Sequence, residues 1–258
     1  MKALLRRLFG RFYWVKHSKS LNYKGAWKNG VFNGPGQLKY ANGTTFRGTF
    51  SNGLKHGSGV LLSSSGYRYA GDWVKGKKTG FAMISYKNGS YFRGNVLDGL
   101  RHGHGEIFDA LSKIRFKGVW VKDIIKEEVT ITSSQWLFVG PMPDYEGNTK
   151  GEMKYPNGSV YQGELKDFMR HGQGILKTDL SETIEGIWSD NVNVQKAEKW
   201  DASGAFWKGN LRNLKPQGYM HVKLPNGQHY DGLWENGSML RVLSVKNQSK
   251  AVSPYHMH

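Results

Sequence analysis

An aromatic residue followed two positions later by Gly recurs at a nearly constant spacing along this chain of 258 residues. The spacing is 23 residues at most steps, with one step of 24 and one of 22. The pairs are Tyr23/Gly25, Phe46/Gly48, Tyr69/Gly71, Phe92/Gly94, Phe116/Gly118, Phe138/Gly140, Tyr161/Gly163, Trp207/Gly209 and Tyr230/Gly232, with Ile184/Gly186 in the remaining slot. A fixed period of this length indicates a linear array of small units and argues against one globular catalytic domain.

Each unit has the sequence pattern of a β-hairpin. Residues 23–27 alternate as a half-buried strand does, Asn29-Gly30 supplies a turn, and residues 37–40 form a second strand. Asn-Gly follows at residues 42–43 and returns at the same slot in three later units. Because Asn and Gly both tolerate positive φ, we predict type I′ turns at this slot. The structural turn glycines are then Gly43, Gly89, Gly158 and Gly227.

The full pattern, Tyr-x-Gly-x-Trp-x-x-Gly-x-x-x-Gly-x-Gly, resembles the MORN repeat (membrane occupation and recognition nexus). The first copy matches it at Gly25, Trp27, Gly30, Gly34 and Gly36. The second copy has Phe50 in the Trp slot, and the third has Ala82 in the last Gly slot. The resemblance covers roughly residues 23–239. It implies a twisted single-layer β-sheet with a groove lined by the repeat aromatics, and a binding or scaffolding role where no catalytic domain is attached.

The predicted fold is all-β. We expect an elongated, twisted antiparallel meander or solenoid of about ten successive β-hairpin MORN repeats, preceded by a short N-terminal amphipathic helix. The fifth and eighth copies lose several of the repeat glycines, and the sixth has Pro141 and Pro143, which cannot donate hydrogen bonds to a neighbouring strand, so a weak or bent middle is expected. The predicted parts are a basic amphipathic segment at 1–22, N-terminal repeats at 23–120, degenerate repeats or a bend at 121–160, C-terminal repeats at 161–239 and a tail at 240–258.

Positive charge is concentrated in the first part of the chain. The formal net charge is +17, and twelve Lys and Arg residues but no Asp or Glu precede Asp72. Charge that serves solubility alone is usually mixed in sign and spread along a chain, so we predict contact with an anionic surface. The residues assigned to it are Lys2, Arg6, Arg7, Arg11, Lys16, Lys19, Lys24, Lys28 and Arg47.

The segment before the repeats has an apolar helical face and a basic one. The apolar face comprises Leu4, Leu5, Leu8, Phe9, Phe12 and Val15. Three roles are open for it: a cap on the edge of the first hairpin, an anchor to a membrane or partner, or a mitochondrial targeting segment. No secretory signal is evident, so an intracellular location is expected, either mitochondrial or cytosolic and cytoskeletal.

No pattern in the sequence predicts catalysis. The chain has no Cys, which excludes disulfides, Cys-based zinc sites and thiol nucleophiles. The stretch 71–78 approaches a phosphate-binding loop but has Lys78 where Ser or Thr is required. The recurring His56, His102 and His171 occupy one turn slot of separate repeats, and we expect no metal, cofactor or small-molecule substrate.

The sequence supports two functions. The first is a non-catalytic interaction scaffold, a subunit of a larger assembly with other proteins as partners; attachment of this scaffold to an anionic membrane surface is open. The alternative is direct binding of a polyanion, either acidic phospholipid or RNA. The repeat aromatics predicted to bind a partner are Tyr23, Trp27, Phe46, Phe50, Tyr69, Trp73, Phe92, Phe116, Trp120, Tyr161, Trp188, Trp207, Tyr230 and Trp234.

Overall fold

The computed structural model describes residues 21–246, and every secondary-structure element in this range is a β-strand. The chain forms two compact units, divided between Met142 and Pro143. The helix predicted within 1–22 and the cations Lys2, Arg6, Arg7, Arg11, Lys16 and Lys19 lie outside the described residues.

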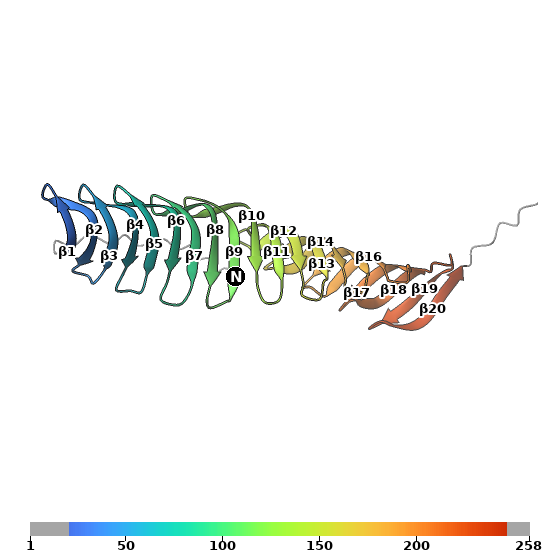
Figure 1. The fold of residues 1–258 in the computed structure, drawn as a ribbon. Helices are drawn as coiled ribbons and strands as arrows, with labels where there is room; N and C mark the ends of the chain where they lie inside the picture. The colour runs from blue at the N-terminus through green and yellow to red at the C-terminus, as the bar shows by residue number, and fades with distance from the viewer. Residues whose placement is uncertain (1–20, 247–258) are drawn as a thin grey trace, which may run out of the picture. The chain divides into compact units, whose positions relative to one another are not determined.

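The first unit is an antiparallel meander in which each strand pairs with the next along the chain (Figure 1). Its strands are β1 (Leu21–Lys28), β2 (Val31–Tyr40), β3 (Thr45–Ser51), β4 (Leu54–Leu62), β5 (Arg68–Val74), β6 (Lys77–Ser85), β7 (Tyr91–Leu97), β8 (Leu100–Asp109), β9 (Ile114–Val121), β10 (Ile124–Thr132) and β11 (Leu137–Pro141).

The second unit repeats this arrangement, again with sequential antiparallel pairing. Its strands are β12 (Asn148–Lys154), β13 (Val160–Lys166), β14 (Met169–Lys177), β15 (Thr183–Ser189), β16 (Asn193–Trp200), β17 (Phe206–Arg212), β18 (Lys215–Lys223), β19 (His229–Glu235) and β20 (Ser238–Lys246). The predicted all-β meander of hairpins is therefore confirmed within each unit.

The two ends of each hairpin carry different turns. At Asn29-Gly30 both residues have positive φ, 50° and 76°, as a two-residue type I′ turn requires. At the Asn42-Gly43 end only Gly43 has positive φ, 82°, and its N–H donates to the carbonyl of Tyr40. The Asn42 side chain accepts a hydrogen bond from the Thr44 N–H, which favours a three-residue loop that ends in a left-handed Gly.

The prediction of type I′ turns at this second end is therefore wrong, because the loop has three residues. The prediction of positive φ at its four glycines is confirmed. The values are 82° at Gly43, 84° at Gly89, 90° at Gly158 and 84° at Gly227.

A row of small residues crosses the first unit from strand to strand. Its members, each paired with the next, are Gly25, Gly36, Gly48, Gly59, Gly71, Ala82, Gly94, Gly105 and Gly118. The aromatic residue two positions before a strand's Gly lays its ring over this row. A Cβ added to Gly48 would lie 2.7 Å from Cζ of Phe46 and 2.7 Å from Cα of Gly59, so the ring leaves no room for a side chain.

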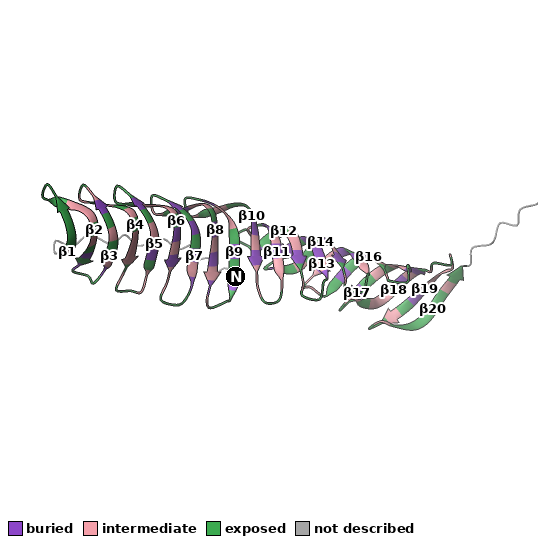
Figure 2. Cartoon of the chain, in the orientation of Figure 1, coloured by how far each residue is buried: buried purple, intermediate pink, exposed green. Residues whose placement is uncertain are grey.

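The rings of successive repeats pack against one another on one face of the sheet, which we call the ring face. Buried positions recur from strand to strand (Figure 2). Edge-on contacts join Trp27 to Tyr23 at 5.3 Å, Tyr23 to Phe50 at 5.2 Å and Phe46 to Trp73 at 5.2 Å between centroids. Such contacts add to the stabilisation from burial. They confirm that Trp27, Phe50 and Trp73 share one face.

Basic side chains at one slot of the repeat lie over these rings. Lys55, Lys78 and Arg101 follow one another at intervals of 23 residues, and Arg170 fills the slot in the second unit. The ammonium groups of Lys55 and Lys78 lie 4.9 and 5.8 Å from the Trp73 ring centroid, within the range of cation–π attraction. Burial lowers the pKa of Lys55 to about 8, and burial together with the charge of Lys55 lowers the pKa of Lys78 to about 8.

The predicted weak middle is irregular in its local structure. In β10 the pairing with β9 shifts between Lys126 and Thr130, where Glu127 has a positive φ of 60°. The boundary between the two compact units falls within the predicted segment 121–160. The bend itself and the other proposed divisions of the chain stay predictions.

The glycine row supplies a stability test. We expect Gly48→Ala to destabilise the protein by about 1–3 kcal/mol, because the new methyl must displace the Phe46 ring or the Gly59 backbone. The control is Gly99→Ala, a turn position with φ of 87° where a Cβ meets nothing within 4 Å. It should cost only about 1 kcal/mol of backbone strain. Urea unfolding followed by circular dichroism measures both, and equal costs would contradict the packing account.

The buried lysines predict a pH dependence. A Lys with a lower pKa in the folded chain binds fewer protons when folded, so stability should rise from about pH 8 towards the unfolded pKa of about 10.4. Burial raises the pKa of the neighbouring Tyr67, so the opposite trend should begin above about pH 10. We expect a gain on the order of 1 kcal/mol between about pH 7 and 9.5. The free energy of unfolding of a Lys55→Met, Lys78→Met double variant should not rise over this pH range. That of the control variant Lys87→Met, at an exposed position, should rise as in the wild type.

Candidate partner-binding face

The repeat aromatics predicted to bind a partner mostly fill the ring face themselves. Nine of them are 3% exposed or less: Phe46, Phe50, Tyr69, Trp73, Phe92, Phe116, Trp120, Tyr161 and Trp188. Tyr23, Trp207, Tyr230 and Trp234 are half-buried, and Trp27, on the first strand, is 58% exposed. We expected an open groove lined by the repeat aromatics. For these nine residues the expectation is wrong, because neighbouring rings and the glycine row cover their side chains. Their role in partner binding stays a prediction.

The opposite face of the first unit is free of these rings. Successive side chains along a strand point to opposite faces, so the residue directly before each repeat Gly points away from the ring face. Directly paired residues of antiparallel strands share a face. From β1 to β11 this central row is Lys24, Gln37, Arg47, Val60, Ala70, Met83, Arg93, Glu106, Lys117, Thr130 and Val139.

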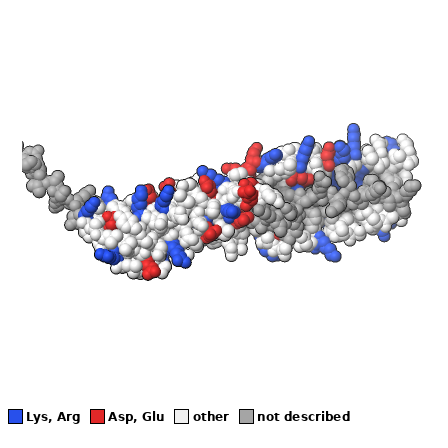
Figure 3. Space-filling view, turned by 180° about the vertical axis from the view of Figure 1, so that it is seen from behind, with Lys and Arg blue, Asp and Glu red and all other residues white. Residues whose placement is uncertain are grey.

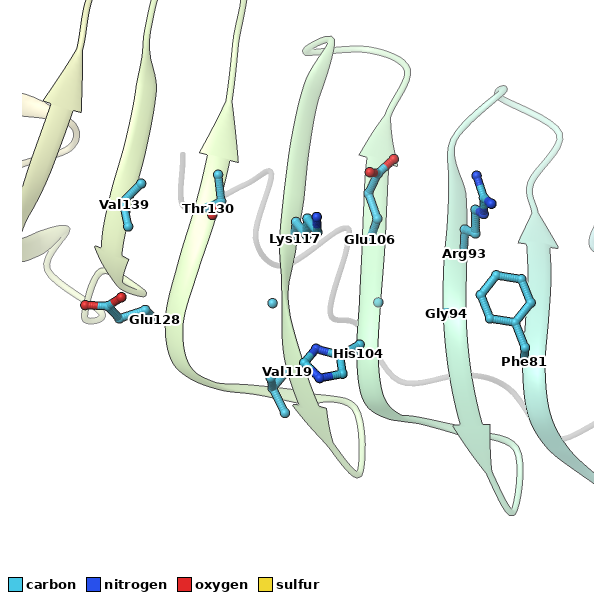
Figure 4. A pocket seen from close by; sticks show the side chains of 12 residues that line it. Phe81, Arg93, Gly94, His104, Glu106, Lys117, Val119, Glu128, Thr130 and Val139 are labelled. Carbon is cyan, nitrogen blue, oxygen red and sulfur yellow. The ribbon is translucent and has the colours of Figure 1, made fainter.

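A hollow of about 490 Å³ lies on this face, over strands β6 to β11 (Figure 4). Arg93, Glu106 and Lys117 of the central row stand along it, on three neighbouring strands. The other lining residues are Phe81, Gly94, His104, Gly105, Val119, Gly118, Glu128, Thr130 and Val139. We call this hollow the trough.

Apolar and charged groups meet in the trough. Phe81 is 54% exposed, and the Arg93 guanidinium lies 5.8 Å from its ring centroid. At the rim, Glu106 accepts a hydrogen bond of 2.9 Å from the Tyr91 hydroxyl. Burial first, and the hydrogen bond to Glu106 second, raise the pKa of Tyr91. A partly apolar floor with polar groups around it is the arrangement of a contact surface for a ligand or peptide.

A second row runs beside the central row and adds to its charge. It contains Lys39, Thr45, Leu62, Arg68, Ser85, Tyr91, Phe108, Arg115, Thr132 and Leu137. The two rows hold seven exposed cations, Lys24, Lys39, Arg47, Arg68, Arg93, Arg115 and Lys117, and one carboxylate, Glu106. Among the described residues, Arg115 is the one of the seven that has an ion pair, at 3.4 Å to Glu106.

The equivalent row of the second unit has a different balance of positive and negative charge. It runs Glu152, Gln162, Ile175, Glu185, Glu198, Lys208, His221, Asp231 and Ser244. Most of its charges are paired, with 2.7 Å from Lys208 to Glu198 and 2.9 Å from His221 to Asp231. Hydrogen bonds from Ser244 and His221 lower the pKa of Asp231. Unpaired positive charge in the central row is thus a feature of the first unit.

Three of the cations predicted to face an anionic surface are described by the structure. Lys24 and Arg47 lie in the central row, and Lys28 is exposed beside the turn that joins β1 to β2. Figure 3, which draws one side of the molecule, shows Lys and Arg side chains projecting separately along its edges. Whether these three contact an anionic surface stays a prediction.

Sequence reasoning missed the trough and the other cations of the two rows. The signal was present, since Arg93 and Lys117 stand directly before the repeat glycines Gly94 and Gly118, as Lys24 stands before Gly25. The lysines that lie over the rings were also missed, although Lys55 and Lys78 are one repeat apart.

Within residues 21–246, no three His, Asp or Glu side chains come together in a way that could hold a metal ion. The same part of the chain contains no helix of the length and apolarity that a membrane span requires.

Solved structures with a related arrangement include the TCP10 domain of Danio rerio CPAP, in complex with a peptide of Danio rerio STIL. It is 10% identical, with 88% of this chain and 99% of that chain covered and a TM-score of 0.49. The SAS-4 TCP domain of Drosophila melanogaster, in complex with a proline-rich motif of Ana2, is 16% identical over 68% and 83% of the two chains, with a TM-score of 0.28. These scores are low, so nothing about the function of this chain follows from them.

A comparison with curated proteins gives no match. The family model of the MORN repeat matches at five places, residues 23–45, 46–66, 69–91, 92–108 and 161–178. The matches in the first unit cover strands β1 to β8, and the last covers β13 and β14. The chain therefore contains MORN repeats at these five places.

Proposed function

We propose that the protein is a non-catalytic interaction scaffold and that the trough of the first unit binds a segment of a partner protein. The observation that carries this proposal is the exposed Phe81 side chain that lines the trough. A large aromatic side chain that is half exposed in a hollow is the type of residue that contributes most to protein–protein binding. The MORN repeats of this chain fit such a role.

Rigid presentation also favours this role. The trough is built on paired strands whose other face is filled by packed rings, so its side chains stand on a preformed surface. A preformed surface loses less conformational entropy when a partner binds. The repeat array then serves as a stiff support that holds a partner segment in place.

The proposal is tested with the variant Phe81→Ser and the matched control Tyr219→Ser. Phe81 and Tyr219 occupy the same slot of the repeat, and each is 54% exposed. Protein that co-purifies in fixed ratio with the full-length chain would be identified after nuclease treatment, and its affinity measured by titration. Phe81→Ser should weaken binding about five- to thirtyfold, as loss of a central aromatic contact does. The control should leave binding unchanged.

Both substitutions are at exposed positions, so stability should change by no more than about 0.5 kcal/mol. Thermal unfolding checks this. Equal affinity of the wild type and Phe81→Ser for the partner would refute the trough as the binding site. Failure of any protein to co-purify would count against the scaffold role itself.

A second candidate is direct binding to a polyanion, supported by the absence of Asp and Glu before Asp72. Each Lys or Arg near an anionic bilayer contributes about 1 kcal/mol. Deletion of residues 1–20 removes six cations and should weaken co-sedimentation with anionic vesicles strongly. Neutral vesicles are the control, and unchanged co-sedimentation after deletion would exclude this role for the segment.

A further inference from the structure

We infer that the central row of the first unit binds an extended acidic segment of a partner protein, in which an acidic side chain recurs at every third residue. This inference rests on the proposed scaffold function and specifies the chemistry of the partner. It concerns the row from Lys24 to Lys117, of which the trough is one part.

The spacing of the cations sets the spacing of the acids. Lys24 and Arg47 are separated by one intervening strand, and so are Arg93 and Lys117. Strands lie about 4.8 Å apart, so each pair of Cα positions is about 10 Å apart along the row. A polyproline II segment has about three residues per turn and rises about 9 Å per turn, which brings every third side chain to the same side. Two successive acids at that interval would face the two cations of one pair.

The cations of this row are available for such a partner. Arg47, Arg93 and Lys117 are exposed, and among the described residues none of the three has an ion pair. The equivalent Lys208 of the second unit is held by Glu198 at 2.7 Å. A binding surface for an acidic segment needs unneutralised charge, and only the first unit offers it in this row.

The groups between the cations favour a peptide over a nucleic acid or a bilayer. Val60, Ala70 and Met83 occupy the row between Arg47 and Arg93, so this stretch of the row offers apolar contacts, with Arg68 of the second row beside it. Glu106 stands between Arg93 and Lys117, and Glu128 also lines the trough. Like charges placed together disfavour binding, so these carboxylates act against phosphate groups. A peptide can pass them with uncharged side chains and still contact the apolar positions.

The test uses the full chain and a synthetic peptide with Glu at every third position and Pro or Ala elsewhere, long enough to span about eight strand separations. Binding is measured by fluorescence anisotropy at low salt. The triple variant Arg47→Gln, Arg93→Gln, Lys117→Gln should bind at least about tenfold more weakly, at about two- to fivefold for each exposed ion pair. Lys208→Gln, at the same slot in the second unit, should bind as the wild type does.

The second arm varies the ligand. A peptide of the same composition with its Glu residues in one block should bind several-fold more weakly, because it cannot place acids at intervals of about 10 Å. Equal binding of the two peptides, or unchanged binding by the triple variant, overturns the inference. Tighter binding of a single-stranded RNA or of anionic vesicles, lost in the triple variant, also overturns it and assigns the row to a polyanion.

The two proposals can fail separately. In one case, Phe81→Ser weakens binding of the native partner but neither acidic peptide binds the wild type. The scaffold function then stands, and the inference that the central row binds an acidic segment is wrong. If the spaced peptide binds through the row but no protein partner depends on Phe81, the row is an acidic-peptide site and the trough is not the site of assembly.

Discussion

The packing of an aromatic ring over a row of glycines is the interaction on which the rest of this structure depends. A single β-sheet has two faces and no second layer to cover either of them. Here the ring of Phe46 lies where the side chains of Gly48 and Gly59 would be, so one face is covered by side chains from its own strands. Rings of neighbouring repeats also contact one another, as Tyr23 contacts Phe50 and Phe46 contacts Trp73, which links the stability of each hairpin to the next.

Packing of the rings on one face also affects the basic residues on that face. The face that holds the rings also holds basic side chains at a repeating slot, and their attraction to the rings compensates in part for burial. Arg101 lies 4.5 Å from the Trp120 ring centroid and 2.8 Å from the Asp123 carboxylate, so its charge is both paired and stacked. Lys55 and Lys78 contact rings and form no ion pair with an acid among the described residues, and burial lowers the pKa of each.

One face of the sheet is used for packing and the other is free to bind a partner, and this difference is the physical basis of the proposed function. Most repeat aromatics are buried in the packing of the ring face. A partner that binds the strands therefore contacts the opposite face, where Phe81, Arg93 and Lys117 are exposed. The regular pairing of the strands turns a repeat in sequence into a row of side chains at constant intervals. A surface of this kind selects partners by the spacing of their groups as well as by their chemistry.

The repeat, the hairpins, the all-β class and the glycines with positive φ could be predicted from the sequence alone, because these depend on residues a few positions apart. It also indicated the shared face of Trp27, Phe50 and Trp73, which follows from their equal place in the repeat. Only the tertiary structure decided that most repeat aromatics are buried, since burial depends on rings contributed by the neighbouring hairpins. The loop at Asn42-Gly43 was decided by strand register, because pairing of Tyr40 with Thr44 leaves three residues in the loop. The trough and the row of unpaired cations arise in the same way, from the alignment of residues about 23 positions apart, such as Arg93 and Lys117, on neighbouring hairpins.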